Sequence, residues 1–326
     1  MPAFAAGDFI KILTINYFSI TMCYRNFIYC VLLISTACNN NENPFSYGAD
    51  THSRGKMNIL VEESFKPLFE TSIYTFEGQY PKTDIQAIYA SEGEIIAAFF
   101  KDSVKTICIS RDFTKLEKAQ LKKRQVEVRS DKIAEDAVAL ILHPTNPDSL
   151  MTIAQIKSII RGEKTIWTGL KTKINIVFDK QNSANFYYLK NFCDLNKLPI
   201  NLFAVNSNEE VINYVKQNKN ALGIIGLNWI SDSDDFDTLG FVQGINVVAI
   251  AKDDKSDYFK PHAGFIYTKE YPLSREIWLI NKAKKSGINT GFVLFMKGDK
   301  GQLIVQKSAL VPATAPVRLI QLITEE

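Results

Sequence analysis

Histidine and cysteine are scarce in this chain, which has three histidines and five cysteines among 326 residues. His52, His143 and His262 are far apart, and they indicate neither a metal site nor a Ser-His-Asp arrangement. The two cysteines beyond residue 40, Cys108 and Cys193, make no disulfide framework, and we expect buried free thiols there. A Gly-rich loop followed by Lys-Ser/Thr is also absent, so nucleotide hydrolysis would fall to a partner. We therefore expect a protein that is not an enzyme and that has no metal and no cofactor.

A strong excess of charge of one sign is absent as well. The chain has 38 Lys and Arg against 35 Asp and Glu, and a net charge of +3 argues against a dedicated nucleic-acid binder. The basic run at residues 122–125 shares its segment with Glu117 and has no interleaved aromatic residues, which is typical of a solvated helix face. With 46% hydrophobic residues, the chain is long enough for two domains with cores of their own.

The N-terminal segment has a composition of its own. A short apolar run follows Arg25, which predicts a signal peptide over residues 1–37, with an uncleaved membrane anchor as the alternative. The end of this run, LLISTAC, resembles the lipobox of bacterial lipoproteins, although Ser35 stands where that family usually has Leu. The resemblance implies lipidation of Cys38, and Met22 is a second candidate start. We expect export to the periplasm or cell envelope, with a lipid anchor in a membrane.

From Met57 onward, segments with strand and helix patterns alternate along the chain. This alternation favours parallel strands covered by helices, an α/β class. Three helix starts carry capping residues, and the pairs Thr114 with Glu117 and Ser207 with Glu210 have capping-box spacing. Thr152 precedes the third helix, and Gly162 stands where that helix would stop. The principal strand patterns lie at residues 57–61, 84–90, 104–110, 134–142, 173–178, 201–205, 221–225 and 244–251.

One strand-to-helix junction, VFDKQNSANFYYLKNF at residues 177–192, has an unusual composition. An apolar run stops at Asp179, short polar residues follow, and an aromatic-rich helical pattern then begins. A strand that ends in short polar side chains before a helix presents free backbone N–H groups together with hydroxyl and amide donors. The junction therefore predicts an anion site.

Several stretches, in order along the chain, resemble one family. EDAVALILHPTNPDSLMTIAQIKSIIRGEKTIW, at residues 135–167, is similar to the crossover strand, helix and Gly-to-Trp ending of bacterial phosphate-binding proteins. SNEEVINYVKQNKNALGIIGLNW, YPLSREIWL and GQLIVQKSALVPATAPVR resemble later stretches of the same family. Together they cover most of Met57–Arg318.

The resemblance implies the two-lobe periplasmic-binding-protein fold of type II, in which each lobe is a mixed sheet flanked by helices and two crossover strands join the lobes. Residues 56–142 and 244–326 would form lobe 1, and residues 143–243 would form lobe 2. A lipidated flexible tether at residues 38–55 would precede them. The resemblance further implies a monomer, a ligand in the cleft between the lobes, and the membrane permease of an ABC importer as a partner.

The family holds phosphate with N–H groups and hydroxyls from three loops. The first loop corresponds here to VEESFKPL, which makes Ser64 and Phe65 candidates, and a plain N-cap is the alternative for Ser64. The second follows the strand KTICIS, which gives Ser110 and Arg111. An Arg fork suits a tetrahedral oxyanion, and a surface salt bridge is the alternative for Arg111.

The third loop is the junction described above, where phosphate binders carry Arg, three residues, and then Ser-Gly-Thr. Asp179 takes the place of that Arg, and such a carboxylate would weaken anion binding unless Lys180 or Arg111 offsets it. Asp179 could instead accept the proton of monoprotonated phosphate, which would disfavour sulfate. It could also face a hinge lysine away from the ligand. The candidate donors of this loop are Gln181, Asn182, Ser183 and Asn185.

The motifs together predict an exported solute-binding lipoprotein that closes around an oxyanion, most simply inorganic phosphate, and delivers it to an ABC permease. A ligand-poor relative that acts as a sensor or envelope scaffold, docked to a membrane complex, is the alternative. The altered third loop keeps both functions open.

Overall fold

The computed structural model describes residues 50–195, 199–231, 240–282 and 286–314. The predicted signal peptide, Cys38 and most of the predicted tether lie outside these residues. Within them, no helix has the length and apolar character needed to cross a membrane.

The elements alternate as the sequence predicts. The strands are β1 (Gly55–Glu62), β2 (Thr83–Ala90), β3 (Thr106–Ile109), β4 (Arg129–Leu142), β5 (Leu150–Thr152), β6 (Asn175–Phe178), β7 (Leu202–Ala204), β8 (Ala221–Gly226), β9 (Asn246–Val247), β10 (Ala249–Ala251), β11 (Ser274–Asn281) and β12 (Val311–Pro312). The helices are η1 (Glu63–Phe65), α2 (Lys66–Gln79), α3 (Glu92–Phe100), α4 (Lys115–Lys123), α5 (Ile153–Ile160), α6 (Ala184–Phe192), α7 (Asn208–Gln217), η2 (Leu227–Trp229), α9 (Ala263–Tyr267), α10 (Ile288–Lys297) and α11 (Asp299–Lys307).

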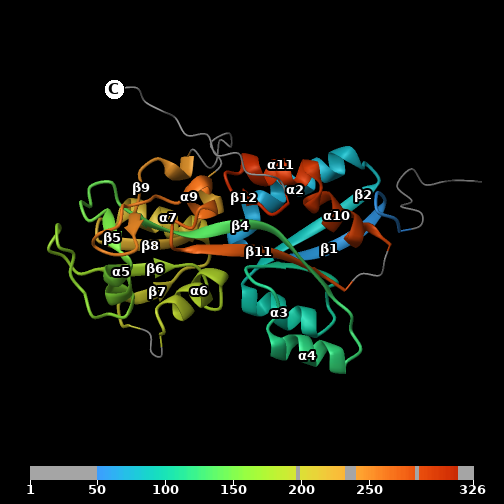
Figure 1. Ribbon diagram of the computed structural model, residues 1–326, viewed down its shortest axis with the longest axis horizontal. Helices are drawn as coiled ribbons and strands as arrows, with labels where there is room; N and C mark the ends of the chain where they lie inside the picture. Colours follow the sequence, from blue (N-terminus) through green and yellow to red (C-terminus); the bar gives the residue numbers. More distant parts are fainter. Residues whose placement is uncertain (1–49, 196–198, 232–239, 283–285, 315–326) are drawn as a thin grey trace, which may run out of the picture. The chain divides into compact units, whose positions relative to one another are not determined.

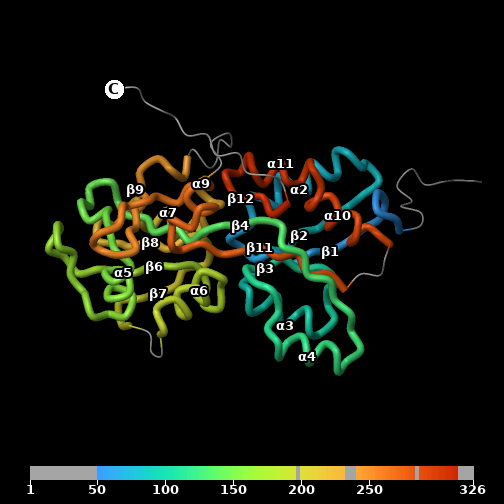
Figure 2. The backbone as a smooth tube through the Cα atoms, in the orientation of Figure 1, coloured from blue at the N-terminus to red at the C-terminus, as the bar shows by residue number. Residues whose placement is uncertain are grey.

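The main sheet has the strand order β2-β1-β3-β11-β4-β8-β6-β7 (Figures 1 and 2). Strand β1 pairs parallel with β2 and β3, and β6 pairs parallel with β7 and β8. Between these two groups, β11 and β4 pair antiparallel with each other and with their outer neighbours. The sheet is therefore mixed, and the predicted α/β class is confirmed.

Strand β4 links the two parallel groups. Its residues up to Ala137 pair with β11, and its last five residues, 138–142, pair with β8. The run AVALIL at its end is buried throughout, as a strand covered on both faces requires. The register of the ladder with β11 shifts between Ile277 and Trp278, whose partners on β4 are Ala134 and Lys132.

The strand predicted at 244–251 is two short strands in the structure. β9 pairs with the end of β4, whereas β10 pairs with β5 in a separate two-stranded sheet. The apolar pattern of this segment predicts one strand, because periodicity does not show where a strand changes partner.

Local capping signals agree with the structure at two of the three helix starts. The capping box predicted for α4 is present, and Thr152 caps α5 with its side chain. At α7, Ser207 accepts from the N–H of Glu210, but the Glu210 carboxylate accepts from Asn206 N–H at 2.9 Å, so the reciprocal box is not formed. Gly162 follows α5 with φ of 77°, a left-handed conformation that glycine adopts without strain.

Helices cover the sheet through apolar faces. Phe76 on α2 makes edge-to-face contacts with Phe292 and Phe295 on α10, with ring centroids 5.4 and 5.2 Å apart. Cys108 and Cys193 are buried free thiols, as predicted. In Figure 1, α2, α10 and α11 lie on one side of β1 and β11, and α3 and α4 lie on the other.

The last residues of the predicted tether contact the helical layer. Asp50 Oδ1 accepts a hydrogen bond from Ile288 N–H at 2.8 Å, at the start of α10. Thr51 and Arg54 form a β-bridge directly before β1.

Candidate ligand-binding site

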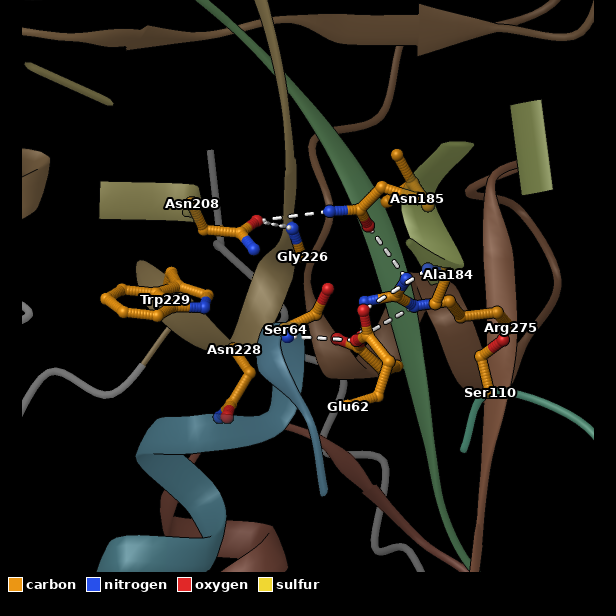
Figure 3. A network of polar contacts seen from close by, with 12 residues as sticks. Glu62, Ser64, Ser110, Ala184, Asn185, Asn208, Gly226, Asn228, Trp229 and Arg275 are labelled. Atoms are coloured by element: carbon orange, nitrogen blue, oxygen red, sulfur yellow. Dashed lines mark hydrogen bonds and ion pairs between the residues drawn. The ribbon is translucent and has the colours of Figure 1, made fainter. Parts of the chain in front are cut away.

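Three strand-end loops come together in one buried polar cluster (Figure 3). β1 ends at Glu62, β3 is followed by Ser110, and β6 is followed by Asp179. β1 and β3 run parallel and end at the same edge of their group, whereas β6 runs opposite to them, so the loop after β6 meets theirs from the other direction. The loops after β1 and β6 are joined directly, because Glu62 Oε1 accepts from Ala184 N–H at 3.2 Å.

The loop after β1 supplies a buried backbone donor and a buried hydroxyl. Ser64 is fully buried, and its N–H donates to Glu62 Oε2 at 2.9 Å. Within the described residues, Ser64 Oγ has no hydrogen-bond partner. Phe65 contributes its ring, over which the Arg275 guanidinium lies at 4.9 Å from the centroid. Ser64 Oγ is thus the free donor of this loop.

Glu62 accepts a hydrogen bond from a backbone N–H group of each of the two loops that it joins. One carboxylate oxygen accepts from Ser64 N–H and the other from Ala184 N–H, the first N–H of α6. Complete burial raises the pKa of Glu62, while the positive charge of Arg275 opposes this rise. A carboxylate of the chain itself therefore stands where an anionic ligand would accept hydrogen bonds.

In the loop after β3, a carboxylate of the chain, Glu92, likewise accepts the hydrogen bonds of the loop's donors. Ser110 donates to Glu92 Oε2 through its N–H at 3.0 Å and its hydroxyl at 2.5 Å. Arg111 Nε donates to Glu92 Oε1 at 3.1 Å, and its two terminal nitrogens bind Glu117 at 2.8 and 2.9 Å. The hydrogen bonds that Arg111 donates to Glu117 are the main cause of the raised pKa of Arg111. All three side-chain nitrogens of Arg111 therefore donate to carboxylates of the chain itself.

The loop after β6 surrounds Asp179. Ser183 Oγ donates to Asp179 Oδ1 at 2.5 Å and accepts from Phe186 N–H at 3.1 Å as the N-cap of α6. Asn185 and Asn208 donate their amide groups to Asp179 Oδ2 at 3.1 and 3.2 Å. Burial, reinforced by the charge of Glu62, raises the pKa of Asp179 well above its ordinary value.

Gln181 and Asn182 lie outside this buried cluster, and both are exposed. Asn182 has a left-handed φ of 70°, and its Oδ1 accepts from the Tyr187 hydroxyl at 3.3 Å. Its carbonyl accepts from Gly93 N–H at 3.1 Å, which joins this loop to the start of α3. A Cβ at Gly93 would lie 3.1 Å from Asn182 Cβ, so glycine permits this close approach.

Arg275 from β11 lies at the centre of the cluster. Its Nε and Nη2 donate to Asp136 Oδ2 on β4 at 2.9 and 2.7 Å, and Nη1 donates to Asn185 Oδ1 at 2.8 Å. A Cβ at Gly226 would lie 2.7 Å from Arg275 Nη2 and from Ser64 Cβ. Only glycine leaves room for both.

Acidic side chains outnumber basic ones in this cluster. Burial raises the pKa of Glu63 to about 7, despite hydrogen bonds from Asn208 that favour its charged form. Within the described residues, no group of three or more His, Cys, Asp or Glu side chains is arranged to hold a metal ion. The buried carboxylates are Glu62, Glu92, Asp136 and Asp179, and Arg275 is the buried cation among them.

Sequence reasoning did not select four residues that shape this cluster. Glu62 and Glu92 come at or just after strand ends, so the rule that selected Ser64 and Ser110 applied to them too. Asn208 directly follows a predicted cap, and Arg275 lies in the YPLSREIWL stretch, which was used only as a family motif. No local signal shows that Arg275 reaches α6.

The comparisons with known proteins agree with this geometry. A family model described as a PBP superfamily domain matches residues 48–300. The chain belongs to the PBP superfamily. Phosphate-binding protein PstS of Staphylococcus haemolyticus (strain JCSC1435) is 24% identical over 246 residues, which cover 72% of this chain and 74% of that protein.

Two solved structures have the same fold. One is a putative phosphate ABC transporter substrate-binding protein with bound phosphate from Clostridium perfringens, with a TM-score of 0.67 and 21% identity, covering 79% of this chain and 100% of that one. The other is an ABC-type phosphate transport receptor from Vibrio cholerae, with a TM-score of 0.60 and 19% identity, at 79% and 100% coverage. The resemblance to phosphate-binding proteins and the predicted periplasmic-binding-protein fold are confirmed for this PBP superfamily member.

Proposed function

We propose that this PBP superfamily member is an exported solute-binding protein that binds an oxyanion, inorganic phosphate in the first place, and delivers it to an ABC permease. The observation that carries the proposal is the convergence of three strand-end loops on one cluster, where the buried Ser64 Oγ has no hydrogen-bond partner among the residues that the structure describes. The relatives and solved structures named above are phosphate binders by name, which supports phosphate as the first ligand to test.

The two-lobe arrangement and its membrane attachment belong to the same proposal. Residues 56–142 and 244–326 would form one lobe and residues 143–243 the other, with a hinge motion that closes the cleft on the ligand. Lipidation of Cys38 would hold a monomer at the membrane, near its permease. Catalysis is no part of this proposal, and turnover of phosphate esters would be the test against it.

Asp179 sets the specificity within this proposal. A buried carboxyl beside the ligand can accept a hydrogen bond from monoprotonated phosphate, whereas fully ionised sulfate has no proton to donate. Ser183 and Asn185 hold the Asp179 carboxylate in place at 2.5 and 3.1 Å. Phosphate should therefore bind in preference to sulfate.

A ligand-poor sensor or envelope scaffold is a second candidate function. The occupation of the loop N–H groups by Glu62 and Glu92 favours it, because these donors have acceptors without any ligand. Such a protein would dock to a membrane complex through its fold and would have no high-affinity anion site.

Calorimetric titration of the chain from Asn39 onward, freed of anion, separates the two functions. We expect phosphate to bind, sulfate to fail to displace it, and Ser64→Ala to weaken binding by roughly tenfold, the effect of about one lost hydrogen bond. Ser256→Ala is the matched control, because Ser256 Oγ lies on an exposed turn and donates to Asp253. Absence of heat and of thermal stabilisation with either anion would favour the scaffold or sensor.

A further inference from the structure

The Glu62 carboxylate links two segments of the site that are distant in sequence. It reaches from the end of β1 to the first residue of α6, across 122 residues of chain, and uses one oxygen for each N–H. The side chain is fully buried. This is the hydrogen-bond pattern that two oxygens of a tetrahedral oxyanion would make with the same N–H groups.

The hydrogen bonds that Glu62 accepts favour its ionised form, whereas burial raises its pKa. Both oxygens accept hydrogen bonds from backbone N–H groups, and a protonated carboxyl would turn one of them into a donor. No ion pair among the described residues involves Glu62, since Arg275 gives its hydrogen bonds to Asp136 and Asn185.

A second observation at the same place points to a ligand. Ser64 Oγ is buried and lacks a partner within the described part of the chain, although Ser64 N–H is bound by Glu62. A buried hydroxyl without a partner is costly, and a ligand oxygen beside it would remove that cost. In Figure 3 the Ser64 side chain lies among Gly226, Glu62 and Arg275, inside the cluster.

We propose that Glu62 is an internal competitor for the ligand: its carboxylate occupies the N–H groups of Ser64 and Ala184, and an oxyanion binds only by displacing it. This inference rests on the proposed function. According to this inference, Glu62 determines both the affinity of the site for phosphate and the number of protons taken up on binding.

The displaced carboxylate has few places to remain ionised. When the N–H groups of Ser64 and Ala184 donate to phosphate oxygens instead, the Glu62 carboxylate loses both hydrogen-bond donors. It then lies beside other carboxylates and the bound phosphate, which is a monoanion or a dianion. One proton from solvent then binds a Glu62 oxygen, so binding is coupled to proton uptake. The titratable and charged groups that interact with Glu62 are Arg275 from β11, Cys108 in β3, Glu63 in η1, Glu92 at the start of α3, and Asp179 before α6.

Glu62→Gln tests the proposal, because the amide keeps the shape of the side chain and removes its charge. Phosphate is titrated into the purified protein at pH 8 in two buffers of different ionisation enthalpy, which gives both affinity and proton uptake. We expect Glu62→Gln to bind phosphate at least about tenfold more tightly and to take up about one proton fewer than the wild type.

Glu77→Gln is the matched control. Glu77 on α2 also caps a backbone N–H with its carboxylate, that of Ile85 at 2.7 Å, and is not one of the residues of the cluster. We expect this variant to bind phosphate with wild-type affinity and proton uptake. If Glu62→Gln does not fold by its circular dichroism and melting curve, Glu62→Ala takes its place.

The outcomes separate the inference from the proposed function. Binding by Glu62→Gln but not by the wild type, or tighter binding with reduced proton uptake, supports the competitor. Wild-type phosphate binding with equal or weaker binding in the variant, or with unchanged proton uptake, overturns the competitor and leaves the proposed function intact. Failure of both proteins to bind phosphate overturns both.

Discussion

The loops after β1 and β3 begin in the same way, with a strand end, a serine and a neighbouring glutamate, yet they differ in burial. Around Ser64, the glutamate bridges to α6 and the nearest cation, Arg275, is buried with only 6% exposure. Around Ser110, the cation is Arg111, whose side chain is 37% exposed and which is held by two glutamates. Burial decides the energetic weight of these similar charge pairs, because water screens an exposed pair and does not reach a buried one.

The strongest test of this comparison is removal of the buried cation. Arg275→Met would leave Asp136 buried without a counter-charge, and we expect a loss of about 3–5 kcal/mol in the free energy of unfolding. Denaturant unfolding at pH 7 measures it. A loss below about 1 kcal/mol would show that solvent reaches Asp136, contrary to its complete burial.

The pH dependence of stability gives a second test. The pKa of Glu63 is raised by burial from 4.5 to about 7, so the folded state holds this proton more tightly than the unfolded state. The stabilisation is complete below pH 4.5 and is lost as the pH rises through about 7, with a total of about 3 kcal/mol for a shift of this size.

Glu63→Gln isolates this contribution. The variant cannot ionise at this position, so the difference in unfolding free energy between wild type and variant should change between pH 4.5 and 7. Parallel denaturant titrations across that range measure it. A constant difference would contradict the raised pKa, and Glu77→Gln serves as the control glutamate.

The smallest expected effect is at Arg111, whose side chain is 37% exposed although its partner Glu92 is buried. Arg111→Gln breaks a partly solvated contact with Glu92 and Glu117, and we expect a loss of at most about 1 kcal/mol in the free energy of unfolding. Raising the salt concentration should reduce the difference further. If Arg111→Gln lost as much free energy of unfolding as Arg275→Met, burial would not explain the difference between the two loops.

Much of the fold was predictable because its signals are local. Apolar runs of strand length and helix starts such as Thr114 and Thr152 depend on neighbouring residues only. The break between β9 and β10 was missed for the opposite reason, since it reflects which strands they pair with. Strand pairing is a property of residues distant in sequence.

The site divides in the same way. The positions of Ser64, Ser110 and Ser183 at strand ends follow from the local pattern, and so does the role of Ser183 as the N-cap of α6. Their hydrogen-bond partners do not. Glu62 is 122 residues from Ala184, and Arg275 is 139 residues from Asp136.

The sequence by itself determined the α/β alternation, the strand-end loops and their supply of N–H and hydroxyl donors, because backbone propensity and capping act within a few residues. Only the tertiary structure decided which carboxylates accept from those donors and which hydroxyl stays free. Burial and hydrogen-bond distance depend on side chains brought together from β1, α3, α6 and β11. The hydrogen-bond donors of such a site can be predicted from the sequence pattern, whereas their acceptors are known only from the tertiary structure.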